Sequence, residues 1–171
     1  IDLLDDAERG RVLRDWNNTD HPLDAGVTVL SLFEATVARH PERVAVIDAA
    51  TGIEWSYREF ASRVYRWARY LLSRGVRVGS LVAVAIPRSV EQVVAMYAVV
   101  AAGGGYVPVD PDHPADRTGY VLAAAEPAVV LVGAADRQTL AGLPALPRLV
   151  RRFGLEAPML QRLAADRPEL L

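Results

Sequence analysis

Three consecutive glycines, Gly103, Gly104 and Gly105, form the stretch of this chain that is closest in composition to a phosphate-binding loop. Such loops follow a strand and begin a helix, because the amides at the helix N-terminus then point at the anion. Here the order is reversed: a predicted helix ends at about Ala102, and a strand begins at Tyr106. The helix end that faces the turn is the negative one. The sequence therefore predicts a structural turn at the glycines.

Histidines are the next candidates, as metal ligands. His21, His40 and His113 are far apart, and none has a second histidine or a carboxylate at the spacing of a metal-binding motif. We therefore expect no metal at these histidines.

An acidic cluster of Asp110, Asp112 and Asp116 allows two interpretations. The carboxylates could bind a cation, or they could cap a helix that is predicted to begin at Pro114 and complement its dipole. Two prolines interrupt the cluster and a helix starts within it, so the sequence favours capping.

Serines and aromatic residues are the remaining candidates for a functional site. No G-x-S-x-G motif is present, and no serine has a base beside it; the serines considered are Ser31, Ser56, Ser62, Ser73, Ser80 and Ser89. The aromatic group could stack on nucleic-acid bases, but its helical spacing and the lack of a basic track favour core and half-buried surface. That group consists of Trp55, Tyr57, Tyr65, Trp67 and Tyr70. We therefore single out no catalytic, cofactor-binding or metal-binding residue.

Composition excludes several classes of function. The net charge of −2 would not recruit nucleic acid or an anionic membrane. Without cysteine there is no disulfide, thiolate catalysis or Cys-based zinc site. All 19 basic residues are arginines, so a lysine contact to phosphate cannot be made. No apolar run reaches the ~18 residues of a membrane span, and the acidic N-terminus is unlike an export signal. We expect a cytoplasmic protein.

The elements that would position these residues follow from periodicity. Ser56 and Glu59 form a capping box that begins a helix, and Gly75 would close it with a left-handed cap. The apolar stripe of this helix consists of Phe60, Val64, Trp67 and Leu71. A second serine cap, at Ser89, begins the helix that leads to the glycine turn.

The remaining pattern alternates helices and strands. We predict helices over about 5–16, 28–39, 89–102 and 114–125, and strands over 43–48, 53–55, 81–86, 106–109 and 128–132. Strands that are apolar on both faces, between amphipathic helices, predict an α/β fold: a mostly parallel sheet with helices on both faces. Beyond Ala134 the sequence is only weakly periodic, with a weak helical pattern at 158–165.

Two motifs, WSYREF at Trp55–Phe60 and AAGGGYVPVDPDHPADR at Ala101–Arg117, resemble core motifs of the adenylation domains of nonribosomal peptide synthetases, in the order that family shows. The resemblance extends from about Leu3 to Gly133. LLDDAERGRVLRDWNNTDHP is similar to the linker between condensation and adenylation domains, and LSLFEATVARHPERVAVID to the first helix and strand of the adenylation domain. The chain thus resembles an incomplete N-terminal portion of the adenylate-forming enzyme fold.

The resemblance divides the chain into an interdomain linker (1–25), an N-terminal portion of the adenylation core subdomain (26–133) and an atypical C-terminal tail (134–171). In that family both motifs are mainly architectural, and the residues that bind ATP, magnesium and the amino acid lie later in the chain. No catalytic or binding residue is therefore carried over. Ala101 stands where the family usually has lysine, and the tail does not resemble the stretch that leads to the phosphate loop.

The resemblance implies that an intact domain activates an amino acid with ATP and Mg²⁺ and transfers the adenylate to the phosphopantetheine thiol of a carrier protein. This is a reaction of bacterial secondary metabolism. The chain alone is expected to be inactive. Its expected partners are the remaining adenylation-domain residues, neighbouring condensation and carrier domains, and an MbtH-like accessory protein. Uncovered sheet edges and core faces should make it self-associate or require a partner.

Two alternatives remain open. The chain could be a catalytically silent remnant that acts as a structural or docking module between synthetase domains, in which case it should be monodisperse and melt cooperatively. It could also be an independent nucleotide-binding α/β domain, which predicts measurable affinity for ATP.

Overall fold

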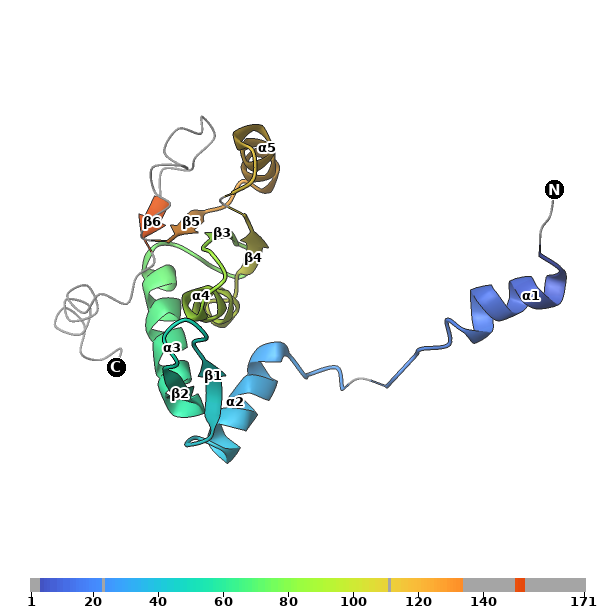
Figure 1. The fold of residues 1–171 in the computed structure, drawn as a ribbon, viewed down its shortest axis with the longest axis horizontal. Helices are drawn as coiled ribbons and strands as arrows, with labels where there is room; N and C mark the ends of the chain where they lie inside the picture. Colours follow the sequence, from blue (N-terminus) through green and yellow to red (C-terminus); the bar gives the residue numbers. More distant parts are fainter. Residues whose placement is uncertain (1–3, 23, 111, 134–149, 153–171) are drawn as a thin grey trace.

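A four-stranded parallel sheet forms the centre of the protein in the computed structural model (Figure 1). The structure describes residues 4–22, 24–110, 112–133 and 150–152. The strands, in their order across the sheet, are β4 (Gly105–Pro108), β3 (Leu81–Ala85), β5 (Val129–Val132) and β6 (Val150–Arg152). Each neighbouring pair is parallel. The predicted parallel sheet is confirmed, whereas β6 was not predicted because the sequence around it is only weakly periodic.

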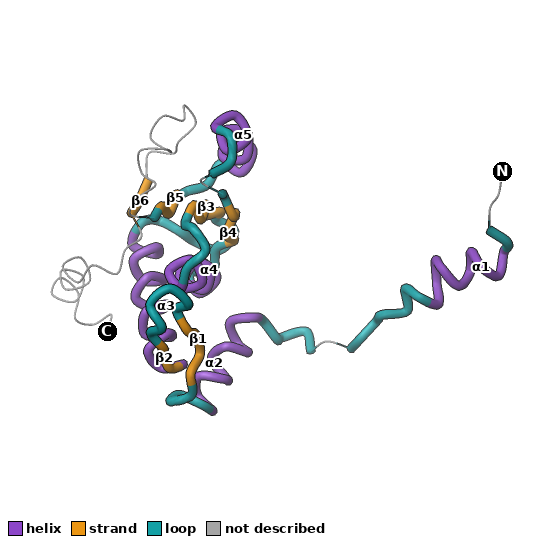
Figure 2. The backbone as a smooth tube through the Cα atoms, in the orientation of Figure 1, coloured by secondary structure: helices purple, strands orange, loops and turns teal. Residues whose placement is uncertain are grey.

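Helices cover both faces of this sheet, as the sequence predicts (Figure 2). Helices α3 (Tyr57–Ser73) and α4 (Val90–Ala101) lie on one face, and α5 (Ala115–Ala125) lies on the other. Successive side chains of a strand point to opposite faces. Accordingly, Val82 of β3 belongs to the core shared with α3 and α4, and Ala83 to the core shared with Leu122 of α5.

An antiparallel hairpin and one further helix pack beside α3. Strands β1 (Val44–Ile47) and β2 (Glu54–Ser56) pair with each other, and α2 (Val29–Arg39) precedes them. Phe33 of α2 and Trp55 of β2 are buried in the same core as α3 and α4. The Tyr65 hydroxyl on α3 donates to Glu34 Oε1 on α2 at 2.9 Å, and burial together with this hydrogen bond raises the pKa of Tyr65 to about 12.

The ends of α3 confirm the predicted caps. The Glu59 amide donates to the Ser56 hydroxyl at 3.3 Å, and the Ser56 amide donates to Glu59 Oε2 at 2.9 Å. At the other end Gly75 has φ of +91°, a conformation that costs glycine little. Ser89 caps α4 as predicted, since its hydroxyl accepts from the Gln92 amide at 3.3 Å.

The N-terminal segment stands apart from the rest of the described chain (Figures 1 and 2). Helix α1 (Asp6–Gly10) continues into a π-helical turn, Arg11–Asp15, so the predicted helix over 5–16 is present but changes its hydrogen-bond pattern midway. Neither piece contains a buried residue. No helix within the described ranges is long and apolar enough to cross a membrane. The predicted helical pattern at 158–165 lies outside the described residues.

Candidate functional site

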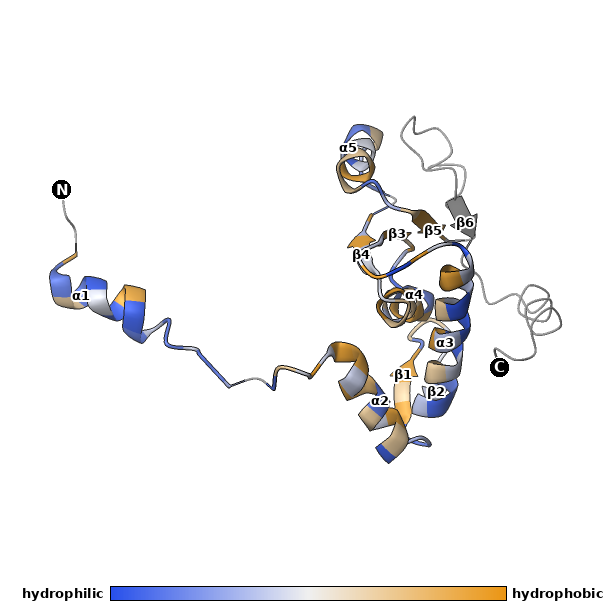
Figure 3. Cartoon of the chain, turned by 180° about the vertical axis from the view of Figure 1, so that it is seen from behind, coloured by the Kyte–Doolittle hydropathy of each residue, from blue (hydrophilic) through white to orange (hydrophobic). Residues whose placement is uncertain are grey.

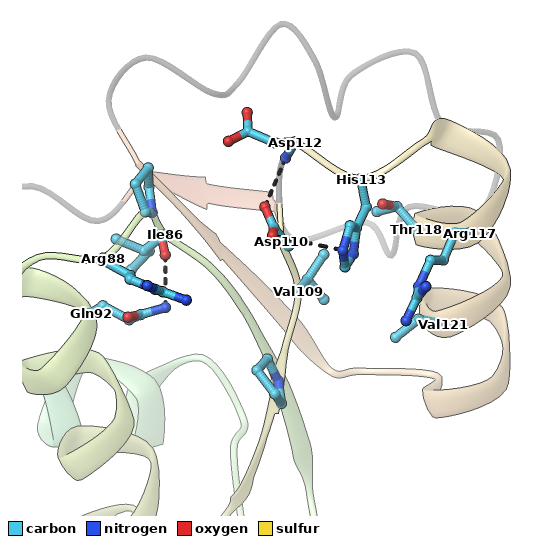
Figure 4. A pocket seen from close by; sticks show the side chains of 12 residues that line it. Ile86, Arg88, Gln92, Val109, Asp110, Asp112, His113, Arg117, Thr118 and Val121 are labelled. Carbon is cyan, nitrogen blue, oxygen red and sulfur yellow. Dashed lines mark hydrogen bonds and ion pairs between the residues drawn. The ribbon is translucent and has the colours of Figure 1, made fainter.

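A pocket of about 570 Å³ opens where β3 and β4 end (Figure 4). The residues that line it are Ile86, Pro87, Arg88, Gln92, Pro108, Val109, Asp110, Asp112, His113, Arg117, Thr118 and Val121. They come from the segments that follow the two strands and from the first turns of α4 and α5. In a parallel sheet the carboxyl ends of the strands share one edge, which places these four segments around a single opening.

This opening lies at a topological switch point. β4 and β5 pair with opposite edges of β3, and α4 and α5 cover opposite faces of the sheet. The connections that leave β3 and β4 therefore diverge and leave a crevice between them. In open α/β sheets ligands bind in such crevices, outside the carboxyl ends of the strands. The pocket is for this reason the candidate functional site.

Some of the hydrogen-bond acceptors that line the pocket are engaged, whereas the Asp112 carboxylate has no partner among the described residues. Asp110 Oδ1 accepts from the Asp112 amide at 3.0 Å, and Asp110 Oδ2 lies 3.7 Å from His113 Nε2. The Ile86 carbonyl accepts from Gln92 Nε2 at 2.9 Å. In Figure 4 the Asp112 carboxylate points away from the space between Arg88 and His113.

Donors remain available. The guanidinium groups of Arg88 and Arg117 have neither an ion-pair nor a hydrogen-bond partner among the described residues. Thr118 is only 4% exposed, and its hydroxyl makes no hydrogen bond to another described residue that lines the pocket (Figure 4). The arrangement can therefore receive a group that is rich in hydrogen-bond acceptors.

The aspartate cluster differs from the prediction. Asp116 lies in the first turn of α5, where it complements the dipole as expected, but the N-cap residue is Pro114 and no side chain caps the helix. Asp110 instead accepts from Asp112 and pairs with His113. The turn after β4 folds His113 back towards Asp110, a contact that the sequence analysis did not predict. Within the described ranges, no three His, Cys, Asp or Glu side chains gather as a metal site would require.

The glycine turn is structural, as predicted. It follows the C-terminus of α4 and leads into β4. A Cβ on Gly104 would lie 3.0 Å from the Ser80 carbonyl oxygen and 3.3 Å from side-chain atoms of Val76 and Val99. The amides of the three glycines donate to backbone carbonyls of Val100, Val99 and Ser80, so they are not available to a phosphate.

The serines and aromatic residues also occupy structural positions. Ser31 takes part in a capping box with Thr28, Ser73 donates to the Tyr70 carbonyl, and Ser80 accepts from the Arg77 amide. The Ser56 hydroxyl does meet a carboxylate, Glu59 Oε2 at 3.0 Å, but this contact is part of the cap. Trp55, Trp67 and Tyr70 are buried, and Tyr57 and Tyr65 are half-buried, as predicted.

The ATP and Mg²⁺ that the sequence resemblance implies do not fit the described residues. The packed glycine turn leaves no cradle for a triphosphate, the sequence contains no lysine, and the part of the chain that is described gathers no metal-binding carboxylates. We therefore assign no step of an adenylation reaction to a residue within the described ranges.

Sequence reasoning missed the pocket residues Arg88, Gln92, Arg117 and Thr118. A signal was present, since the predicted strand 81–86 stops at Pro87 and the position directly after a parallel strand is where sites of this class of fold occur. An arginine in the loop after a strand and another in the first turn of a helix form no sequence motif, however, and only the sheet order brings Arg88 and Arg117 to one opening.

Comparison with known proteins agrees with this architecture. The family model described as AMP-binding enzyme matches residues 33–169. One of the subunits of the linear gramicidin synthase of Brevibacillus parabrevis is 33% identical over 170 residues, which is 99% of this chain and 3% of that protein. The probable non-canonical nonribosomal peptide synthetase CymA of Salinispora arenicola is 41% identical over 131 residues, 77% of this chain and 2% of that protein.

A solved structure shows the same likeness in three dimensions. The crystal structure of the nonribosomal peptide synthetase FmoA3 in its alpha-methyl-L-serine-AMP bound form superposes with a TM-score of 0.71 and 36% identity, covering 81% of this chain and 15% of that one. The chain therefore spans a small fraction of the proteins that it matches. On its sequence motifs, its parallel α/β sheet and these matches, this chain belongs to the AMP-binding enzyme family, in which it matches part of the adenylation domain of nonribosomal peptide synthetases.

Proposed function

We propose that this chain forms the N-terminal part of an amino-acid-activating adenylation domain in a nonribosomal peptide synthetase. The observation that carries the proposal is the pair of motifs at 55–60 and 101–117, which follow each other in the order of that family. The first spans the end of β2 and the start of α3, and the second contains β4 of the parallel sheet. In the intact domain an amino acid and ATP would form an aminoacyl adenylate. The aminoacyl group would then pass to a carrier protein.

The residues present indicate which functions of the domain this chain would serve and which would come from elsewhere. The chain contributes a folded sheet and its covering helices, and residues beyond it contribute the contacts to ATP, Mg²⁺ and the amino acid. The phosphopantetheine thiol belongs to the carrier domain. Neighbouring condensation and carrier domains, with an MbtH-like accessory protein, would be its partners in a cytoplasmic, bacterial assembly for secondary metabolism.

A structural module is the second candidate. The absence of lysine from the sequence favours it, because an adenylation remnant that does not bind ATP could still hold neighbouring synthetase domains apart. In that case the work of the chain would be to dock or space those domains, with no chemistry of its own.

A chimeric adenylation domain that carries a segment of this chain, called the graft below, distinguishes the two candidate functions. Residues 33–133 would replace their counterparts in the aligned adenylation domain of the linear gramicidin synthase, and amino-acid-dependent exchange of pyrophosphate into ATP would be measured. The parent domain and the 171-residue chain alone serve as positive and negative controls. We expect exchange by the graft and none by the chain alone. A graft that is folded and monodisperse but inactive would favour the structural module.

A further inference from the structure

We propose that the pocket at the carboxyl ends of β3 and β4 binds a small organic molecule through an oxyanionic group, with Arg88 and Arg117 as its charged contacts and Thr118 as a buried hydrogen-bond donor. The site is distinct from the adenylation chemistry proposed above and does not depend on it. Its three contacts come from two separate connections of the sheet, the loop after β3 and helix α5.

The choice of an anion follows from what the pocket leaves unsatisfied. Both oxygens of Asp110 are engaged, by the Asp112 amide and by His113, and the Ile86 carbonyl accepts from Gln92. The Asp112 carboxylate also lines the pocket but points away from the space between Arg88 and His113 (Figure 4). The groups left to contact a ligand in that space are the two guanidiniums and the Thr118 hydroxyl. An arginine presents five N–H donors and no acceptor, so a ligand that satisfies this set must supply acceptors.

Thr118 is the observation that separates this pocket from an ordinary surface hollow. Its side chain is buried, with 4% of the residue exposed, yet its hydroxyl makes no hydrogen bond to another described residue that lines the pocket (Figure 4). The hydroxyl oxygen is not itself sealed from solvent, so water or a ligand in the pocket can be its partner. A ligand oxygen inside the pocket would satisfy it.

The dipoles of helices α4 and α5 also favour a negatively charged ligand. The N-termini of α4 (12 residues) and α5 (11 residues) both border the pocket. Each N-terminus carries a partial positive charge, which favours an anion nearby. This effect adds to the two arginines.

The size and walls of the pocket predict an organic ligand. A volume of about 570 Å³ lies within the range of small-molecule sites and exceeds what a bare phosphate needs. Pro87, Pro108, Val109 and Val121 give it apolar walls. A molecule with an apolar body and one phosphate or carboxylate group would contact both the apolar walls and the two arginines. Phosphate esters and organic acids are the two classes of molecule with this composition.

The test is a titration of the ¹⁵N-labelled 171-residue chain, followed by NMR at constant ionic strength. Three probes are compared: phenyl phosphate, benzoate and inorganic phosphate. We expect saturable shifts of the amides of Gln92, Arg117 and Thr118 with phenyl phosphate or benzoate, and weaker binding of inorganic phosphate because it cannot use the apolar walls. Preference for phenyl phosphate would indicate a phosphate ester, and preference for benzoate an organic acid.

Matched variants assign the contacts. Arg88→Gln and Arg117→Gln should each weaken binding roughly tenfold or more, as expected for loss of a charge-assisted hydrogen bond. Arg39→Gln removes the same charge from an exposed position at the end of α2, outside the pocket, and should leave the affinity unchanged. Thr118→Val keeps the side-chain shape and should weaken binding severalfold without lowering the melting temperature.

The proposal is overturned if none of the three probes gives saturable shifts, or if Arg39→Gln weakens binding as much as the two pocket variants. It is also overturned if Thr118→Val lowers the melting temperature and leaves the affinity unchanged, because the hydroxyl would then serve the fold.

Discussion

At the scale of single residues, the start of α3 depends on reciprocal hydrogen bonds between Ser56 and Glu59. The bonds from the Ser56 amide and hydroxyl lower the pKa of Glu59 below its ordinary value of 4.5, the amide contributing most. A carboxylate with a lowered pKa stabilises the fold above its unfolded pKa, and this stability is lost as the pH falls through the folded pKa. The cap should therefore weaken in acid.

Two substitutions test the cap. Ser56→Ala should lower the free energy of unfolding by about 1 kcal/mol, whereas Ser62→Ala, at an exposed position inside the same helix, should not lower it. Glu59→Gln should be less stable than the parent at about pH 7, and the difference should shrink as the pH falls through the folded pKa of Glu59, which lies below 4.5. Urea unfolding at several pH values measures both effects. A difference that is the same at every pH would show that the charge of Glu59 plays no part.

Replacing each of two glycines by alanine should change the stability of the fold in opposite directions. Gly104→Ala should destabilise the fold by about 1–3 kcal/mol, since the new Cβ would press on the Ser80 carbonyl and two valines. Gly119→Ala, inside α5 with open space around the added Cβ, should stabilise it by about 0.5–1 kcal/mol. Thermal unfolding of both variants shows whether each substitution raises or lowers the stability of the fold. A neutral Gly104→Ala would contradict the packed turn and reopen the anion-loop interpretation.

At the scale of elements, α3 contributes many side chains to the larger core. Two neighbouring leucines on this helix test which of its faces is buried. Leu71 is fully buried against that core, whereas Leu72 is 39% exposed. Leu71→Ala should cost about 2–5 kcal/mol because it leaves a cavity, and Leu72→Ala should cost far less. Denaturant unfolding monitored by circular dichroism compares them. Equal costs would mean that α3 packs in a different rotation from the one described.

The elements also show what the sequence could predict. Caps and periodicity locate local structure, so the predicted helix after Ser56 and the all-apolar strand 128–132 are present. The sheet order and β6 depend on contacts between distant segments and have no local signal. The pocket depends on the same sheet order, because Arg88 and Arg117 share an opening only when β3 and β4 are neighbours. The contact between Asp110 and His113 depends on the shape of the turn after β4. The two prolines in that stretch of the sequence do not predict this shape.

At the scale of the whole molecule, apolar surface gathers at the end formed by α2 and the β1–β2 hairpin, where the start of α2 and part of β1 are hydrophobic (Figure 3). Six aliphatic residues there are between 48% and 63% exposed: Val27, Val29, Leu32, Val44, Ile47 and Ile53. Exposed aliphatic surface of this kind favours association. We therefore expect the isolated chain to self-associate as its concentration rises.

Sedimentation velocity at several concentrations tests this expectation. The double variant Leu32→Ser with Ile47→Ser should shift the chain towards monomer. The control with Val78→Ser and Tyr120→Ser, which changes exposed residues elsewhere, should behave as the parent. A parent chain that stays monomeric and melts cooperatively would instead match a module that stands alone.

If this chain supplies part of the architecture of an adenylation domain, as we propose, the groups that choose and activate the amino acid lie outside it. The most direct test compares the amino-acid profile of pyrophosphate exchange between the graft of residues 33–133 and its parent domain. We expect the same preferred amino acid in both, with changes only in the overall rate. A graft that prefers a different amino acid would place recognition within this chain and contradict the claim.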